Sequence, residues 1–364
     1  MLPEPEADAL AASAALLARI RAEIEARGGW IGFSRYMELA LHEPGLGYYA
    51  GGAAKLGAPG DFSTAPEMGT LFARTLARQV AEILQSGEAI LEFGAGSGAL
   101  AEALIAELAP ERYLILETSA ELRARQEARL GRRAMWIDRL PEHFRGVMLA
   151  NEVADAMPVH ALAWRGSTIM ERGVDEKLAW AERPAAGELL AAARRLEVPV
   201  PYESEIGLVS RAWMKLLAAR LERGALFVID YGFPQREYYH PQRTAGTLMC
   251  HYRHRAHGDP FFHPGLQDIT AHVDFTALAR AAREGGLEVL GYANQAQFLV
   301  NCGITEVLER EDASDVARYA PRAAEANKLL SPAEMGELFK VLAVGRGVSQ
   351  PLLGFASGDR SHTL

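Results

Sequence analysis

The sequence predicts an α/β protein in which a mostly parallel sheet carries helices on both faces. Short apolar runs alternate with segments of helical periodicity between residues 89 and 152, a pattern typical of βαβ units. A further apolar run follows at residues 224–232, after a long intervening stretch. The chain then closes with a helical pattern and two more apolar runs, the last of them at residues 339–347.

Each strand of the predicted sheet has a local signal. The first, residues 89–93, reads AILEF and runs into a glycine-rich turn before a predicted helix at 99–108. The other strands are predicted at residues 112–118, 134–138, 146–152, 224–232, 287–293 and 339–347, with helices at 119–131 and 273–286. The short apolar runs and the periodic segments between them favour strands joined by amphipathic helices.

Several segments lie outside this sheet. Helices are predicted at residues 8–27, 32–41 and 68–84, with a loop rich in Gly, Ala and Pro at 50–67, and a hairpin at 165–182. The predicted organisation is an N-terminal helical cap and lid (1–69), a core (70–160, 211–235 and 270–347), two insertions (161–210 and 236–269) and a flexible tail (348–364).

Composition narrows the class of protein. The 364 residues are 49% hydrophobic and carry a formal net charge of −9, which argues against binding nucleic acid or an anionic membrane. Two distant cysteines give no disulfide framework. The acidic N-terminus lacks the features of a signal or transit peptide, and no apolar run is long enough to span a bilayer. We therefore expect a cytoplasmic protein without membrane insertion.

Residues 91–98, LEFGAGSG, place three glycines directly after the first strand. Gly94, Gly96 and Ala99 satisfy the dinucleotide motif G-x-G-x-x-G/A, whereas Gly94, Gly96 and Gly98 satisfy G-x-G-x-G. Both motifs let the backbone approach a ligand at a helix N-terminus. In both, Glu117 at the end of the second strand is placed to accept hydrogen bonds from ribose hydroxyls. The alternative for Glu117 is a capping or solvated carboxylate.

Glu92 distinguishes the two cofactor classes. It lies two residues before Gly94, where a nearby pyrophosphate would make its carboxylate unfavourable. S-adenosylmethionine has no phosphate and carries ammonium and sulfonium groups, which a carboxylate attracts. The glycine loop is therefore predicted to bind S-adenosylmethionine rather than NAD.

Motifs along the chain resemble the MidA family of class I S-adenosylmethionine-dependent methyltransferases. They are GYY…GDFSTAPE, LEFGAGSGAL, NEVADAMPVH, IDYG, GTL…YRHR and DITAHVDF, in the family's order over about residues 30–346. The resemblance implies a Rossmann-like, seven-stranded sheet whose last strand inserts antiparallel beside the fifth. Mitochondrial members of the family act in complex I assembly, where they methylate an arginine of an iron–sulfur subunit. The resemblance therefore also implies protein arginine methylation.

The resemblance assigns further residues to the cofactor. Asp61 and Thr64 would belong to a lid near the cofactor's carboxylate, and Asp138 is assigned to the cofactor as well. Thr64 and Glu67 alternatively form a capping box at a helix start. The loop departs from the family's usual G-P-G-R-G, and Val153-Ala154 replaces a usual aromatic pair, which alters the walls of the site.

Residues 149–158, LANEVADAMP, carry the candidate catalytic residues Asn151, Glu152 and Asp155. In class I methyltransferases this position faces both the methyl donor and the acceptor. Methyl transfer needs in-line alignment and a destination for the acceptor proton. Two carboxylates can hold a guanidinium, whose five donors lie in one plane. The alternative is that Asn151 and Asp155 cap the strand end and a following helix.

Other residues are predicted to line the acceptor site. They are Tyr48, Tyr49, Asp230, Tyr231 and His272, each with a purely structural alternative as a core or strand-end residue. The histidine-rich stretch 250–263 is not expected to bind a metal, because Arg253 and Arg255 would oppose a cation.

The sequence as a whole predicts an S-adenosylmethionine-dependent methyltransferase that acts on a protein arginine side chain and needs no metal. One alternative is a small-molecule methyltransferase, which would have a closed, apolar acceptor pocket. The other is an assembly factor that binds the methyl donor without turnover.

Overall fold

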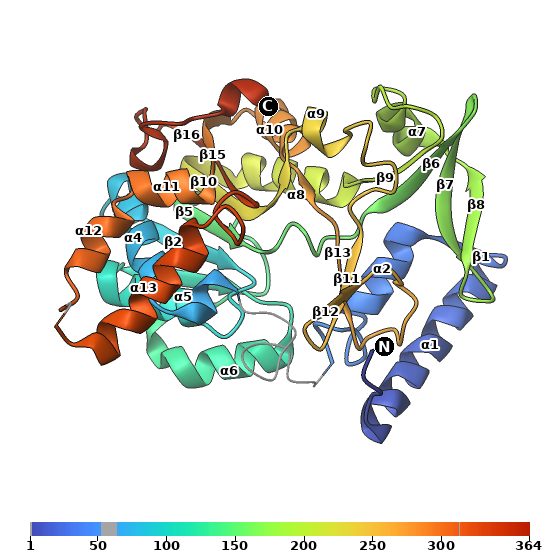
Figure 1. Ribbon diagram of the computed structural model, residues 1–364, viewed down its shortest axis with the longest axis horizontal. Coiled ribbons are helices and arrows are strands. Elements are labelled where there is room, and N and C mark those ends of the chain that lie inside the picture. Colours follow the sequence, from blue (N-terminus) through green and yellow to red (C-terminus); the bar gives the residue numbers. More distant parts are fainter. Residues whose placement is uncertain (1, 52–63, 313) are drawn as a thin grey trace. The chain divides into compact units, whose positions relative to one another are not determined.

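The computed structural model describes residues 2–51, 64–312 and 314–364. Contacts between these residues group the chain into two compact units, and Figure 1 labels their elements. The first unit comprises Met1–Phe62, Asp155–Ala212 and Gln235–Asp274, and the second comprises Ser63–Ala154, Trp213–Pro234 and Phe275–Leu364. The segments predicted as an N-terminal cap and two insertions thus gather largely into one unit, which the sequence did not indicate.

The second unit contains the predicted mostly parallel sheet. Its main path runs β15-β16-β10-β5-β2-β3-β4. Parallel pairing joins β10 to β5, β5 to β2, β2 to β3 and β3 to β4, whereas β16 is antiparallel to β10, as predicted for the last strand. The strands are β2 (Ala89–Phe93), β3 (Arg112–Leu116), β4 (Met135–Trp136), β5 (Phe144–Asn151), β10 (Leu221–Phe233), β15 (Glu288–Asn294) and β16 (Phe339–Arg346). This path has seven strands, and the sheet counts eight in all.

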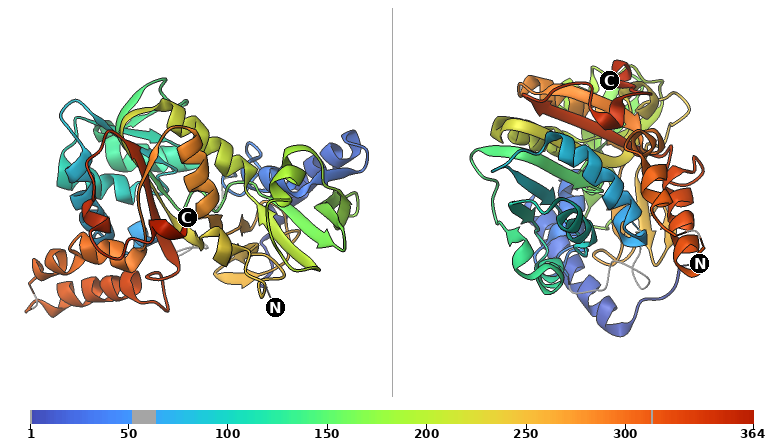
Figure 2. Two further views of the ribbon diagram at one scale, coloured as in Figure 1. Left: turned by 90° about the horizontal axis from the view of Figure 1, so that it is seen from above. Right: turned by 90° about the vertical axis from the view of Figure 1, so that its left-hand side faces the viewer.

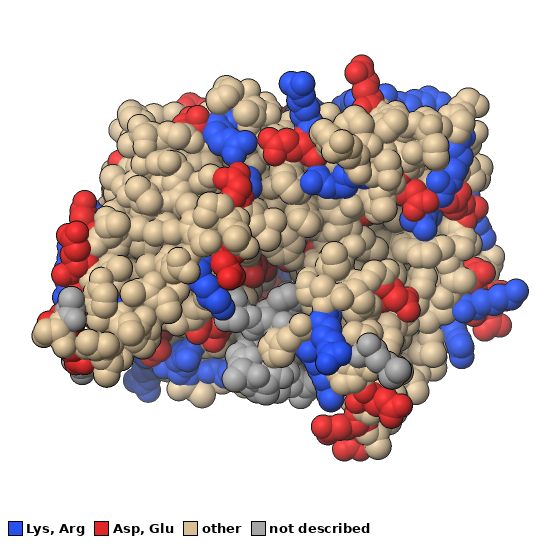
Figure 3. All heavy atoms as spheres, in the orientation of Figure 1, with Lys and Arg blue, Asp and Glu red and all other residues tan. Residues whose placement is uncertain are grey.

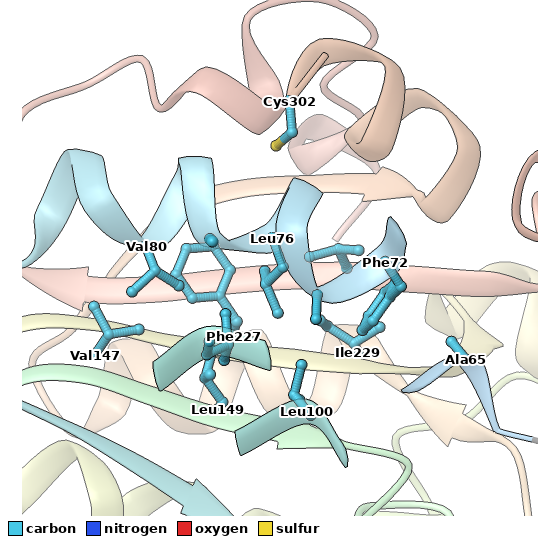
Figure 4. Close-up of a cluster of buried hydrophobic side chains, with 14 of the residues drawn as sticks. Ala65, Phe72, Leu76, Val80, Leu100, Val147, Leu149, Phe227, Ile229 and Cys302 are labelled. Carbon is cyan, nitrogen blue, oxygen red and sulfur yellow. The ribbon is translucent and has the colours of Figure 1, made fainter. Parts of the chain in front are cut away.

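Helices of the second unit cover both faces of the sheet, as the continuous apolar strands predicted. On one face, Phe72, Leu76 and Val80 of α4 (Leu71–Ile83) pack over strand residues such as Leu149 and Phe227 (Figure 4). On the other face, α10 (Phe275–Glu284) contacts β10, β15 and β16, with Phe275 packed against Tyr292. Figure 2 shows the strands between these helices.

The helices of the second unit are α3 (Ala65–Met68), α4 (Leu71–Ile83), α5 (Ala99–Leu108), α6 (Ala120–Leu130), η1 (Gly131–Arg133), α10 (Phe275–Glu284), α11 (Gln295–Asn301), α12 (Ile304–Glu309), α13 (Val316–Leu330), η2 (Leu353–Phe355) and η3 (Ser361–Thr363); α8 (Leu208–Arg220) begins in the first unit and ends in the second. Of these, α4, α5, α6 and α10 follow predicted helical segments, whereas α3 begins in the segment predicted as a loop, and η2 and η3 lie in the predicted flexible tail.

The predicted flexible tail, residues 348–364, is instead packed on the second unit. Leu352 and Phe355 are buried, and the Phe355 ring lies 5.4 Å from that of Phe298, centroid to centroid. Gln79 of α4 accepts a hydrogen bond from the backbone N–H of Gly354 at 2.7 Å. The apolar residues Leu352, Leu353 and Phe355 form one short group without helical or strand periodicity, so the sequence did not reveal this contact.

The first unit contains two antiparallel sheets. The larger has the order β1-β7-β6-β9, with β8 paired to β7 in the predicted hairpin, and the smaller has the order β12-β11-β13. The strands of these sheets are β1 (Trp30–Gly32), β6 (His160–Arg165), β7 (Thr168–Asp175), β8 (Trp180–Pro184), β9 (Tyr202–Ile206), β11 (Met249–Tyr252), β12 (Arg255–His257) and β13 (Asp268–Thr270). The short β14 (Val273–Asp274) belongs to neither of them. The helices are α1 (Ala7–Ala26), α2 (Phe33–His42), α7 (Gly187–Ala193) and α9 (Gln235–Tyr238).

The first unit has a hydrophobic core of its own. Buried side chains of α1 and α2, such as Leu16, Ile20 and Tyr36, pack with Val174 of β7 and Ile269 of β13. Among the described residues, no helix has the length and apolar character needed to cross a bilayer.

Candidate active site

The glycine loop has a backbone that favours glycine at three positions. Gly94, Gly96 and Gly98 have φ angles of 57°, 55° and 81°, in the left-handed region that other residues rarely adopt. The N–H of Gly94 donates to the carbonyl of Leu116 at 3.0 Å, which ties the loop to the end of β3. Helix α5 begins at Ala99, directly after Gly98, so its first N–H groups lie at this loop.

Helix α6 holds the glycine loop through two side chains that sequence reasoning missed. Gln126 Nε2 donates to the carbonyl of Gly96 at 2.9 Å. Arg129 donates to the carbonyl and to the hydroxyl of Ser97, at 3.1 and 2.6 Å. The Ser97 hydroxyl donates in turn to Glu67. Side-chain hydrogen bonds thus fix the loop on the side of α6.

Glu117 lies just beyond β3, where the sequence placed it. Its Oε1 accepts from the backbone N–H of Ser119 at 2.9 Å, and its Oε2 accepts from Gln126 Nε2 at 2.9 Å. Gln126 therefore contacts both predicted cofactor elements, the glycine loop and the carboxylate after the second parallel strand.

Glu92 is a buried carboxylate on β2, two residues before the loop. The hydroxyl of Tyr113 donates to its Oε2 at 2.6 Å. Burial raises the pKa of Glu92 to about 7. The hydrogen bond from Tyr113 opposes this shift, whereas the charge of Glu117 adds to it. A cationic ligand near Glu92 would favour its ionised form.

The residues after β5 combine a strained backbone with a carboxylate. Glu152 has a φ of 53°, unusual for a residue other than glycine, and such strain clusters at functional sites. Its N–H donates to the carbonyl of Ile229 at 2.9 Å, and Asn151 Nδ2 donates to its Oε1 at 3.2 Å. A Cβ built on Gly94 would lie 3.4 Å from a methyl of Val153. This segment therefore lies against the glycine loop.

Asp230 holds the same segment from β10. Its side chain is fully buried. Its Oδ2 accepts from the N–H of Ala154 at 3.0 Å and its Oδ1 from the N–H of Tyr231 at 2.9 Å. The ring of Tyr231 packs edge-on against Phe339, 5.5 Å away. These contacts favour a role for Asp230 in shaping the backbone around Glu152.

Other predicted cofactor residues show weaker links to this cluster. Asp138 has an 82% exposed side chain, which forms an ion pair with Arg123 at 2.7 Å. Thr64 precedes α3, but its side chain makes no capping hydrogen bond, and the Glu67 carboxylate contacts Ser97. The alternative of a capping box at this helix is therefore wrong. Asp61 lies outside the described residues.

Four predicted site residues belong to the first unit. Tyr48 is buried against Tyr49, whose hydroxyl donates to the buried Asp268 at 2.9 Å. Asp155 Oδ1 accepts from the N–H of Ala156 at 2.8 Å, and the N–H of His272 donates to Thr247 Oγ1 at 3.1 Å. No helix follows Asp155 before β6, so its predicted alternative as a helix cap is wrong, and its role toward an acceptor stays a prediction. Within the described residues, no His, Cys, Asp and Glu side chains form a metal-binding group.

This cluster fits S-adenosylmethionine. A left-handed glycine turn admits the ligand to the N-terminus of α5, Glu117 offers acceptors for a ribose, and the buried Glu92 favours a ligand that carries positive charge. A parallel sheet with an antiparallel β16 beside β10 completes the arrangement. These features define the class I S-adenosylmethionine-dependent methyltransferases.

Comparison with known proteins specifies the family. A family model described as "Putative S-adenosyl-L-methionine-dependent methyltransferase" matches residues 72–293, more than half of the chain. The chain belongs to this family, and its resemblance to the MidA methyltransferases is confirmed. S-adenosylmethionine is therefore its methyl donor.

A solved structure and two curated relatives illustrate the similarity. A Burkholderia thailandensis protein, described as a "likely methyl transferase" and bound to S-adenosyl-homocysteine, is 51% identical and has a TM-score of 0.96 with full coverage of both chains. The mitochondrial protein arginine methyltransferase NDUFAF7 homolog of Drosophila melanogaster is 27% identical over 97% of this chain and 91% of its own. Human NDUFAF7, also named a mitochondrial protein arginine methyltransferase, is 26% identical over 87% and 80%.

Proposed function

We propose that this methyltransferase modifies an arginine side chain of a protein, and that its acceptor is a subunit of a respiratory complex under assembly. The proposal rests on the carboxylate of Glu152, held by a strained backbone beside the glycine loop. The names of the relatives from Drosophila and human support the arginine acceptor.

The chemistry assigns a role to each residue of this segment. The methyl donor supplies a sulfonium-bound methyl group, and in-line attack by a guanidinium nitrogen forms the N–C bond while the C–S bond breaks to leave a thioether. Glu152 accepts hydrogen bonds from the guanidinium and orients one nitrogen. It also stabilises the positive charge of the guanidinium, and the proton that the attacking nitrogen loses passes to water. Asn151 orients Glu152, and Asp230 fixes the backbone around it.

The variant Glu152→Gln tests this role, because it keeps the shape of the side chain and removes its charge. We expect methyl transfer to fall roughly a hundredfold, the scale of losing a positioned catalytic group, with donor affinity within a few-fold of the original. Glu142→Gln is the matched control, since Glu142 is exposed and precedes the opposite end of β5. The control removes the same charge and is expected to keep full activity.

The acceptor is identified by labelling. Purified protein is incubated with methyl-tritiated S-adenosylmethionine and a lysate of its host in which the gene is deleted. Label recovered as methylarginine from protein hydrolysate supports the proposal. Label in the small-molecule fraction would replace it with a small-molecule methyltransferase. Donor binding without transfer to any fraction would make the protein an assembly factor.

A cytoplasmic location is part of the proposal. Cys250 and Cys302 are both buried and unbonded, a state that a reducing compartment preserves. Fractionation of host cells followed by immunoblotting is expected to find the protein with cytoplasmic markers. Recovery with organelle or periplasmic markers would contradict this location.

A further inference from the structure

We infer that Gln126 is a positioning residue for the cofactor, which sets the Glu117 carboxylate and the glycine loop in one fixed arrangement. The inference rests on the proposed contact between Glu117 and the ribose of the cofactor. It is independent of the acceptor, since it concerns cofactor recognition alone.

The place of Gln126 in α6 is the first observation. Leu122, Gln126 and Leu130 are the buried residues of this helix, spaced four apart along one face. Gln126 is 0% exposed. A buried amide in an apolar stripe is unfavourable unless its hydrogen bonds are satisfied. Gln126 stands where an aliphatic residue would pack, which indicates that its side-chain hydrogen bonds serve the site beside the helix.

The hydrogen bonds of Gln126 determine how its amide is oriented. The indole N–H of Trp136 donates to Gln126 Oε1 at 2.9 Å, and an indole nitrogen can only donate. The amide nitrogen must therefore face the other way, toward the carbonyl of Gly96 and Oε2 of Glu117, each at 2.9 Å. Both hydrogens of the amide group are used, one on each cofactor element.

This geometry restrains the Glu117 side chain at both oxygens. The backbone N–H of Ser119 holds Oε1 and Gln126 holds Oε2. Because a carboxylate has about four lone-pair sites, these bonds are compatible with further bonds from a ribose diol. A side chain fixed before binding loses less conformational entropy when the ligand arrives. Gln126 thereby increases the preference of the site for a ligand with ribose hydroxyls.

The test compares two ligands on one set of variants. Calorimetry measures the affinity for S-adenosylhomocysteine and for its 2′,3′-dideoxy analogue, which lacks the hydroxyls. Gln126→Met keeps the length and apolar fit of the side chain and removes its hydrogen bonds. We expect this variant to lower the affinity for S-adenosylhomocysteine about tenfold, the scale of one hydrogen bond to a charged group. The affinity for the analogue is expected to change less than about threefold. The ratio of the affinity for S-adenosylhomocysteine to that for the analogue therefore falls.

Gln79→Met is the matched control for any loss of stability. Gln79 is equally buried and bonds Glu82 and the backbone of Gly354, both at 2.7 Å, in contacts that do not involve the glycine loop. Thermal unfolding of both variants is recorded, and Gln79→Met is expected to keep the original ratio of affinities. A Gln79→Met variant with an equally reduced ratio would overturn the inference, since the effect would then be general destabilisation.

The variant Glu117→Gln tests separately whether Glu117 binds the ribose, on which the positioning role of Gln126 rests. If this variant loses the preference for the ribose hydroxyls and Gln126→Met retains it, the positioning role is refuted. If Glu117→Gln also retains it, the ribose contact of Glu117 is wrong and the inference fails with it. The arginine proposal is untouched by either result, because no acceptor is present in the experiment.

Discussion

Glu92 gives the protein a titration close to neutral pH. Burial raises the pKa of this carboxyl from 4.5 to about 7 in the folded chain. The folded state therefore holds a proton that the unfolded state has lost, so the free energy of unfolding falls as pH rises from about 4.5 to about 7. Glu92→Gln has no charge to titrate. We expect it to gain stability over the original protein across this range, on the order of 3 kcal/mol at pH 8.

Urea denaturation at a series of pH values measures this difference. Tyr113→Phe is the companion variant, because it removes the hydrogen bond that lowers the pKa of Glu92. It is expected to move the pH transition upward while leaving the carboxyl in place. A difference between Glu92→Gln and the original protein that is constant from pH 5 to pH 8 would show that Glu92 does not titrate there.

Gly96 allows a second residue-scale prediction. A valine at a φ of 55° is strained, and its branched side chain would stand where the loop meets its ligand. Gly96→Val is expected to abolish detectable S-adenosylhomocysteine binding by calorimetry. Gly87→Val is the control, since Gly87 has a φ of 78° with open space around a built Cβ. The Gly87→Val variant carries similar backbone strain and should bind S-adenosylhomocysteine normally. An equal loss of binding in both variants would mean that backbone strain alone is responsible.

Individual site residues were predictable where the signal is local. Gly94, Gly96, Gly98 and Glu117 follow predicted strands, and the ends of parallel strands meet at one edge of a sheet. Gln126 and Arg129 contact the glycine loop only through the packing of α6, which no spacing within the loop encodes. The sequence offered one sign of the role of Gln126. Leu122, Gln126 and Leu130 recur at helical intervals, and a polar residue between two leucines on a buried face indicates a specific hydrogen bond.

At the scale of elements, the C-terminal segment stabilises the sheet of the second unit. Phe355 is 4% exposed, and a Cβ built on Gly291 of β15 would lie 2.1 Å from its ring. The ring thus occupies space that only a glycine leaves open. Phe355→Ala is expected to lower the free energy of unfolding by about 3 kcal/mol, since it opens a cavity in packed surroundings.

Denaturation in urea tests this contribution against an exposed position. Val316→Ala removes apolar atoms from a side chain that is 69% exposed, so little change is expected. Equal and small effects of both substitutions would show that Phe355 contributes no packing energy.

The elements themselves divide into predictable and unpredictable sets for a physical reason. Strands β2, β3, β5 and β10 have mostly apolar, buried centres because both faces are covered, and this appears in the sequence directly. The larger sheet of the first unit depends on pairing between distant segments, such as Trp30 of β1 with Asp175 of β7. Periodicity predicts a strand but does not name its partner, so only the β7–β8 hairpin was accessible.

At the scale of the whole molecule, the net charge of the chain affects which acceptors associate with the enzyme. The chain has a formal net charge of −9. On the face drawn in Figure 3, the described Lys and Arg side chains are interspersed with Asp and Glu. The excess negative charge attracts a cationic acceptor and repels an anionic one, an effect that salt screens. S-adenosylhomocysteine is a zwitterion, so its binding depends little on this field.

The proposed arginine acceptor therefore predicts a specific salt dependence. With the acceptor found by labelling, supplied as a peptide that carries its arginine and a net positive charge, kcat/KM is expected to fall roughly threefold or more as NaCl rises from about 0.05 M to about 0.5 M. The affinity for S-adenosylhomocysteine, measured in the same buffers, should change less than about twofold. The same peptide extended by aspartates to a net negative charge is the control, and its kcat/KM should rise or stay level with salt. If kcat/KM for the cationic peptide is insensitive to salt, long-range attraction is not part of acceptor recognition, and contacts such as that with Glu152 must carry it alone.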